Sequence, residues 1–380
     1  MRYVFIVQGE GRGHLTQAMS MERLLRENGH VVAAIMVGKS PSRRLPSFFQ
    51  ESVKAPVEMF ESFNFVPSSS NRKASSLKTG LYNILNMAKF LPSIKGIADR
   101  LREIAPDVVV NFYDILGTFG YKKSRINAPM VCVGHQFVFL HRDFKFPSRG
   151  YSGHRALNFF TNMVAWGAAK ILALSFRPMP ADPGRKIRVV PPLLRPAVLG
   201  LRRASGEDDP SVRDGGYVHG YLLNAGFSQD VMDWHHAHPD VPLRFFWDRA
   251  EDAPVKVVDD TLTFYYLDDK EFLRQMAGCH AYASTAGFES VCEAMYLGKP
   301  LLVVPSHVEQ KCNAYDVTEG YGMMSGGRSS GKEIPRPAVS SDCFDLDLLL
   351  HFADSEFVAD ESFPAWARSA DSAFLKELTF

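Results

Sequence analysis

The feature that most constrains the fold is a regular alternation between short apolar runs and longer segments of helical period. Such runs are typical of buried strands, and strands that alternate with helices are typical of parallel sheets covered by helices. The predicted strands are 3–7, 31–37, 107–112, 129–134, 170–174 and 187–190 in the first half, and 217–223, 243–247, 262–266, 280–283 and 301–304 in the second. The pattern therefore predicts an α/β chain of two doubly wound, Rossmann-like domains that face each other across a cleft.

The alternation is interrupted between the two sets of strands. Prolines and the run GEDDP replace it from 191 to 216, and 380 residues are enough for two domains of ordinary size. We expect an N-terminal domain over 1–195, a linker over 196–216, a C-terminal ligand-binding domain over 217–355, and a helical tail over 356–380 that can cross back to the first domain.

The charge is distributed unevenly, although the net charge is only +1. Residues 1–200 contain 28 Lys and Arg against 12 Asp and Glu, and residues 201–380 contain 15 against 30. A basic first half favours an anionic partner such as a membrane surface, a phosphorylated acceptor or nucleic acid. Mutual attraction between the two halves would explain the same pattern.

Membrane-spanning and disulfide-rich classes are disfavoured. No apolar run approaches the roughly 18 residues of a spanning helix, and the start MRYVFIVQGEGRGH becomes polar too soon for a signal peptide. We expect a cytoplasmic protein, which could also act at the inner face of the membrane. The 5 cysteines are scattered without a CxxC pair, so we expect neither a disulfide framework nor a metal site.

A glycine loop follows the first predicted strand, at the edge of the sheet where open α/β folds bind ligands. Its spacing, GxGxGH, differs from the dinucleotide fingerprint GxGxxG, and no acidic residue ends the second strand, so NAD is disfavoured. Gly11 and Gly13 would let a ligand approach the backbone. His14 could take a proton from a hydroxyl at neutral pH, or could simply cap or pack.

Asp114 follows the strand 107–112 at the same rim of the sheet. It could fix the orientation of His14, as a carboxylate does for a histidine base, or could cap the next helix. His135 and Gln136 end the following strand and could line an acceptor pocket.

A second motif begins where the strand 280–283 ends, with the sequence STAGFESVCEAMYLGKPLLVVPSHVEQKCNA over 284–314. Gly287 allows close approach of a ligand, and a helix is predicted from near Phe288. The backbone N–H groups and the dipole of that helix would bind phosphate, with help from the hydroxyls of Thr285 and Ser290.

Three polar residues of the same motif suit sugars. Glu293 could accept hydrogen bonds from a ribose diol, and Glu309 and Gln310 could bind further hydroxyl groups. No lysine stands in the glycine turn, as a P-loop would require. The implied ligand is a diphosphate joined to a ribose and to a second polyhydroxylated group.

The second motif resembles that of the UDP-glycosyltransferases of the GT-B fold. The positions that match without a gap are Thr285, Gly287, Phe288, Ser290, Glu293, Gly298, Pro300, Pro305, Glu309, Gln310, Asn313 and Ala314. The loop GEGRGH is similar to the N-terminal glycine loop of glycosyltransferase family 28, which includes the peptidoglycan N-acetylglucosaminyl transferase.

The resemblance implies a GT-B glycosyltransferase that moves a hexose-type sugar from a nucleoside-diphosphate donor, with UDP expected, to an acceptor hydroxyl. It places the diphosphate on Thr285, Gly287 and Ser290 next to Phe288, the ribose on Glu293, and the transferred sugar on Glu309 and Gln310. It makes His14 the base, with Asp114 as its orienting partner.

The helix N-terminus would replace a divalent metal, so we expect no metal and no cofactor besides the donor. We also expect inversion, because the acceptor oxygen would attack the anomeric carbon directly while His14 removes its proton. The sequence departs from the plant UDP-glycosyltransferases at positions that bear on which nucleobase the donor carries. Thr285 replaces a histidine, Glu289 replaces an asparagine, and a tryptophan that would stack on the nucleobase is not evident.

Two rival functions are weighed against this one. A non-hydrolysing UDP-sugar 2-epimerase would share the fold and the donor. A nucleic-acid-binding protein could use the basic half. That function would not explain the polar residues Glu293, Glu309 and Gln310, so we expect no nucleic acid as a partner.

No motif in the sequence identifies the acceptor, although the positive charge of the first half would suit a lipid-linked or phosphorylated acceptor. The stretch 137–155, rich in aromatic and basic residues, could rest on lipid headgroups or be packed by its own aromatic side chains.

Overall fold

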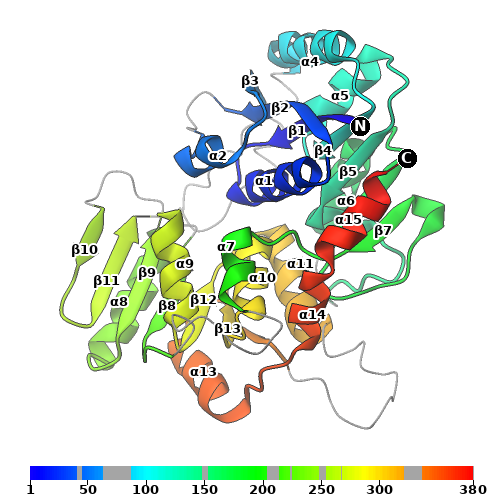
Figure 1. The fold of residues 1–380 in the computed structure, drawn as a ribbon. Helices are drawn as coiled ribbons and strands as arrows, with labels where there is room; N and C mark the ends of the chain where they lie inside the picture. The colour runs from blue at the N-terminus through cyan, green and yellow to red at the C-terminus, as the bar shows by residue number, and fades with distance from the viewer. Residues whose placement is uncertain are drawn as a thin grey trace.

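A computed structural model describes residues 1–40, 45–62, 87–147, 153–202, 214–222, 225–247, 254–266, 268–320 and 336–379. Within them the strands form two seven-stranded sheets, one in each half of the chain (Figure 1). The predicted α/β class with two doubly wound domains is confirmed. No helix of the described part is long and apolar enough to cross a membrane.

The N-terminal sheet has the strand order β3-β2-β1-β4-β5-β6-β7, with every neighbouring pair parallel. Its strands are β1 (Arg2–Gln8), β2 (Val31–Lys39), β3 (Val57–Glu61), β4 (Val108–Phe112), β5 (Met130–Gly134), β6 (Lys170–Leu174) and β7 (Ile187–Val190). Its α-helices are α1 (Arg12–Glu27), α2 (Ser47–Ser52), α4 (Leu91–Ile104), α5 (Ile115–Ser124) and α6 (Gly153–Val164). Short 3₁₀ turns are η1 (Met87–Phe90), η2 (His135–Leu140) and η3 (Pro183–Arg185).

The C-terminal sheet has the order β10-β11-β9-β8-β12-β13-β14, and only the edge pair β10–β11 is antiparallel among the described strands. Its strands are β8 (Val218–Leu222), β9 (Leu243–Trp247), β10 (Val255–Val257), β11 (Leu262–Tyr266), β12 (Ala281–Ser284), β13 (Leu301–Val303) and β14 (Ala338–Ser340). The helices around it are α7 (Pro196–Leu201), α8 (Ser228–Ala237), α9 (Asp269–Gly278), α10 (Phe288–Tyr296), α11 (Val308–Tyr315) and α13 (Leu346–His351).

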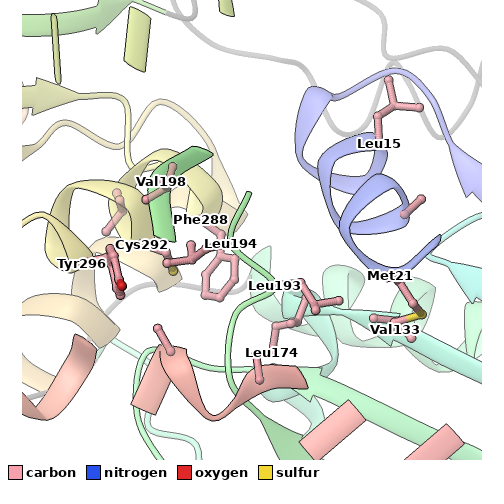
Figure 2. Packing of buried hydrophobic residues seen from close by; sticks show 14 of the residues in the cluster. Leu15, Met21, Val133, Leu174, Leu193, Leu194, Val198, Phe288, Cys292 and Tyr296 are labelled. Carbon is pink, nitrogen blue, oxygen red and sulfur yellow. The ribbon is translucent and has the colours of Figure 1, made fainter. Parts of the chain in front are cut away.

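One apolar core runs from the first domain into the second. Its members shown in Figure 2 come from α1, β5, β6, the connection 191–195, α7 and α10: Leu15, Met21, Val133, Leu174, Leu193, Leu194, Val198, Phe288, Cys292 and Tyr296. Complete burial of one such large side chain stabilises a fold by about 1.5–3 kcal/mol. The domains are therefore held together by apolar packing as well as by the chain itself.

The C-terminal tail contacts both domains. Helix α14 (Ser362–Arg368) packs on α10, and α15 (Ala370–Leu378) packs on β7, where Figure 1 shows it in red. The Tyr3 hydroxyl donates to the Leu378 carbonyl at 3.1 Å, and Trp366 Nε1 donates to the Ser175 carbonyl at 3.0 Å. The tail thus fastens the C-terminal domain to the first strand of the N-terminal one.

The first glycine loop is held tightly against β2. The Gly9 N–H donates to the Gly38 carbonyl at 2.7 Å, and a Cβ at Gly9 would lie 2.6 Å from Cγ1 of Val37. No side chain fits in that space, so only glycine lets β1 turn here. This contact fixes where α1 begins.

Candidate functional site

The two glycine motifs, far apart in the sequence, meet at the domain interface. A Cβ at Gly13 would lie 3.1 Å from Cγ of Glu289, and Gln17 Nε2 donates to Glu289 Oε1 at 2.5 Å. Gly11 is the N-cap of α1, and Gly287 is the N-cap of α10. The tips of α1 and α10 therefore face each other, which is the juxtaposition that the sequence predicts.

His14 lies in the first turn of α1, partly buried, and its ring stacks on Tyr113 with centroids 5.7 Å apart. Its Nε2 is 3.5 Å from Nε2 of Gln136, which donates to Glu309 Oε1 at 3.0 Å. Burial lowers the pKa of His14 to about 4. The ring is thus neutral at pH 7, which is the state that a proton acceptor needs.

Asp114 caps a helix, which is the second of the two roles that the sequence allows for it. It is the N-cap of α5, where Oδ1 accepts from the Gly117 N–H at 2.7 Å and Oδ2 accepts from the Ser62 hydroxyl at 3.0 Å. Burial raises the pKa of Asp114 to about 6. No hydrogen bond joins it to His14 among the described residues, so the expected orienting role is not seen: a position at the same rim does not determine where a side chain points.

The tip of α10 is free of a side-chain cap in this structure. The turn before it holds Ala286 at φ +47°, and a Cβ at Gly287 would meet only Oγ of Ser290, at 3.8 Å. Ser290 Oγ lies 3.4 Å from Oγ of Ser284, and Thr285 is buried beside them. First-turn N–H groups without a cap, behind a glycine that leaves room, are suited to an anion.

His135, which the sequence suggested for the lining of an acceptor pocket, is buried and contacts the α10 turn from the opposite domain. Its ring stacks on Phe288 with centroids 3.8 Å apart. Its Nδ1 donates to the Leu174 carbonyl at 2.8 Å, and its Nε2 lies 2.9 Å from Oδ1 of Asn313.

Asn313 extends this contact to the phosphate turn. Its Nδ2 donates to the Ala286 carbonyl at 3.0 Å. The chain of contacts from β6 through His135 and Asn313 therefore holds the left-handed residue that precedes Gly287.

Glu293 is buried in a bidentate ion pair that the sequence did not suggest. Arg195 donates from Nε to Oε1 at 2.6 Å and from Nη2 to Oε2 at 2.8 Å, and its Nη1 lies 2.5 Å from Oδ1 of Asp269. Arg195 is the N-cap residue of α7, in the connection between the domains. The carboxylate that the resemblance assigns to ribose is thus already held in one orientation.

Glu309 and Gln310 lie in the first turn of α11. Gln310 Oε1 accepts from the Ser306 N–H at 2.9 Å and from the Ser306 hydroxyl at 2.7 Å, which closes the loop after β13. Burial raises the pKa of Glu309 to about 7 and that of Glu289 to about 8. A neutral carboxyl group at these two positions would not repel an anionic ligand.

The stretch 137–155, rich in aromatic and basic residues, contains several buried side chains. Phe137, Phe139 and Phe144 are buried, and Arg142 is ion-paired with Asp182 at 2.6 Å, so the described part of 137–155 is packed by its own aromatic residues. Residues 148–152 lie outside the described part.

Among all the residues that the structure describes, no group of three or more His, Cys, Asp and Glu side chains is placed to hold a metal ion.

Solved glycosyltransferases share this architecture over nearly their whole length. UGT2 of Phytolacca americana, solved with UDP-2-fluoro-glucose and pterostilbene, has a TM-score of 0.60 and 13% identity, over 99% of this chain and 98% of that chain. UGT71G1 of Medicago truncatula, solved with UDP-glucose, gives 0.59 and 14%, over 100% and 98%. The kitacinnamycin glycotransferase gives 0.59 and 16%, over 99% and 98%.

At these identities the similarity establishes the fold, which is GT-B. No curated protein sequence matches the chain. The sequence model of glycosyl transferase family 1, however, matches residues 1–332. The protein therefore belongs to glycosyl transferase family 1 and is a glycosyltransferase.

Proposed function

We propose that the protein transfers a hexose-type sugar from a nucleoside-diphosphate donor, with UDP as the nucleotide, to an acceptor hydroxyl, with inversion and without a metal ion. The observation that carries the proposal is the uncapped tip of α10, which faces the His14 turn across the domain interface. Structural neighbours were solved with UDP-glucose and UDP-2-fluoro-glucose, which supports this choice of donor.

The donor would bind along the second motif. N–H groups of the first turn of α10, with the Thr285 and Ser290 hydroxyls, would hold the diphosphate, and Glu293 would accept from the ribose. Negative charge grows on the diphosphate as its bond to the sugar breaks. The positive end of the α10 dipole would stabilise that charge in the role a metal ion has elsewhere.

The acceptor would be activated from the N-terminal domain. Neutral His14 would take the hydroxyl proton while the acceptor oxygen attacks the anomeric carbon from the face opposite the diphosphate, which inverts the configuration. Gln136 connects this histidine to Glu309, so the base and the proposed sugar-binding residues share one hydrogen-bonded cluster. The basic N-terminal half favours an acceptor that carries a phosphate or a lipid diphosphate.

The test is a thermal-shift panel of UDP, GDP, dTDP and their sugars in the presence and absence of EDTA. A true donor at 100 times its Kd stabilises the fold by about 2.7 kcal/mol. Stabilisation by UDP-sugars that EDTA does not reduce is the expected result, followed by NMR of the anomeric proton of the product. Stabilisation by no nucleotide would overturn the proposal, and conversion of a UDP-sugar without any acceptor would point to an epimerase instead.

A further inference from the structure

Helix α6 carries an exposed stripe that includes two large aromatic side chains. Phe159 is 68% exposed, and Trp166, just after the helix, is 56% exposed. Arg155 and Asn162 are also exposed, and the spacing of 155, 159 and 162 places them on one face of α6. The opposite face carries the buried residue Thr161, whose hydroxyl is 2.7 Å from that of Tyr113.

The surroundings of this stripe are basic. From 115 to 190 the sequence has twelve Lys and Arg against two acidic residues, Asp143 and Asp182, and Asp182 Oδ2 lies 4.0 Å from Nε of Arg185. Lys122 Nζ lies 5.0 Å from the centre of the Trp166 ring. A hollow of about 300 Å³ opens beside the stripe, and its lining includes Asn162, Gly167, Arg185 and Lys186.

We propose that this surface, made by Lys122, Arg155, Phe159, Trp166, Arg185 and Lys186 and here named the α6 face, docks on the surface of an anionic phospholipid bilayer. Trp and Phe partition into the boundary between headgroups and acyl chains, and Lys and Arg around them attract anionic headgroups. An acidic protein partner would match the charge but not the two isolated, protruding rings. The proposal does not depend on the identity of the donor or of the base.

The α6 face shares only Arg155 with the stretch 137–155 that the sequence singled out. Phe137, Phe139 and Phe144 of that stretch point into the core, whereas Phe159 and Trp166 face outward. The basic composition that suggested a membrane is thus retained, but the aromatic residues that could enter one lie on α6.

The experiment is co-sedimentation of the full-length protein with vesicles of phosphatidylcholine alone or mixed with phosphatidylglycerol, at low and high salt. We expect binding only to the anionic vesicles, and weaker binding at high salt. Two double variants, Phe159→Ser with Trp166→Ser and Lys122→Glu with Arg155→Glu, should each lower the apparent affinity at least tenfold. Matched controls are Val257→Ser, at a position 65% exposed on β10, and Lys54→Glu, at an exposed position before β3.

A second readout is the fluorescence of the Trp residues with vesicles whose acyl chains are brominated. Quenching that disappears in Trp166→Phe is expected if this ring enters the bilayer. UDP-induced stabilisation and far-UV circular dichroism should be unchanged in every variant, which separates loss of docking from loss of folding. The proposal is overturned by absence of binding to anionic vesicles at low salt, by both double variants binding as tightly as the parent protein, or by duplex DNA displacing the protein from vesicles.

Discussion

Two helix tips meet at the domain interface, and they differ in what they present. Both α1 and α10 follow a parallel strand, begin after a glycine and lack a side-chain cap. The first turn of α1 carries a histidine that burial keeps neutral, while that of α10 carries Glu289, whose pKa burial raises to about 8. The difference fits the proposed mechanism, in which His14 would accept a proton and the tip of α10 would bind an anion.

The largest expected effect is on the turnover number and comes from removing the proposed base on α1. His14→Ala removes the proposed base and should lower kcat by about 10²–10⁴-fold, the usual contribution of general base catalysis. The affinity for UDP, measured by calorimetry, should change little because α10 is intact. His351→Ala, at an exposed position in α13, is the control. Normal turnover in the His14 variant would remove this residue from the mechanism.

The next effect comes from the buried ion pair between Arg195 and Glu293, which lies on α10. Arg195→Ala leaves the Glu293 carboxylate buried without its partner, and breaking a buried pair costs about 3–5 kcal/mol. Chemical denaturation should detect this loss, and the paired variant Arg195→Met with Glu293→Gln should recover much of it. Arg274→Ala, which breaks an exposed pair with Glu271, should cost about 1 kcal/mol or less.

A smaller effect should separate anion binding from stability. A methyl group at Gly287 meets only an ordinary contact at 3.8 Å, and the backbone there has φ −71°, which any residue adopts. Gly287→Ala should therefore fold normally, yet bind UDP about tenfold more weakly, or about 1.4 kcal/mol, because the methyl group displaces the phosphate. Gly96→Ala, where a Cβ has no neighbour within 4 Å, should leave UDP affinity unchanged. Equal affinities in both variants would place the phosphate elsewhere.

The last prediction concerns pH. Because the pKa of Glu289 is raised from 4.5 to about 8 in the folded state, the folded protein keeps a proton that the unfolded chain has released. This contribution to stability is complete below pH 4.5, falls as the pH rises, and is lost above about 8. Glu289→Gln should make the midpoint of thermal unfolding less dependent on pH across this range, whereas Glu51→Gln, at an exposed position, should not. Parallel curves for Glu289→Gln and the parent protein would mean that Glu289 is ionised.

The sequence predicts the central strands well and the edges poorly. All of the predicted strands are present within two residues, but β3, β10 and β14 were not predicted, and each lies at the edge of a sheet. Edge strands are short and half exposed, as the fully exposed pattern of Val255–Val257 illustrates, so they lack the continuous apolar run that marks a buried strand.

The site follows the same division between local and distant information. The two glycine motifs are local, and their positions at strand ends predict that they meet. Arg195 and Glu293 are 98 residues apart, and His135 and Asn313 are 178 apart, so no spacing rule could pair them. The capping role of Asp114 was one of two alternatives, and only the packing of Ser62 and Gly117 around its carboxylate decides between them.

The crossing tail also limits how the two domains can move. The polypeptide passes between them at 193–195 and returns at Ser369, where α14 ends and α15 begins. Two bodies tethered at two points share an axis through both tethers, and rotation about that axis is their least hindered relative motion. Separation of the halves would strain both connections and open the apolar core that the domains share, whereas rotation about this axis would strain neither connection.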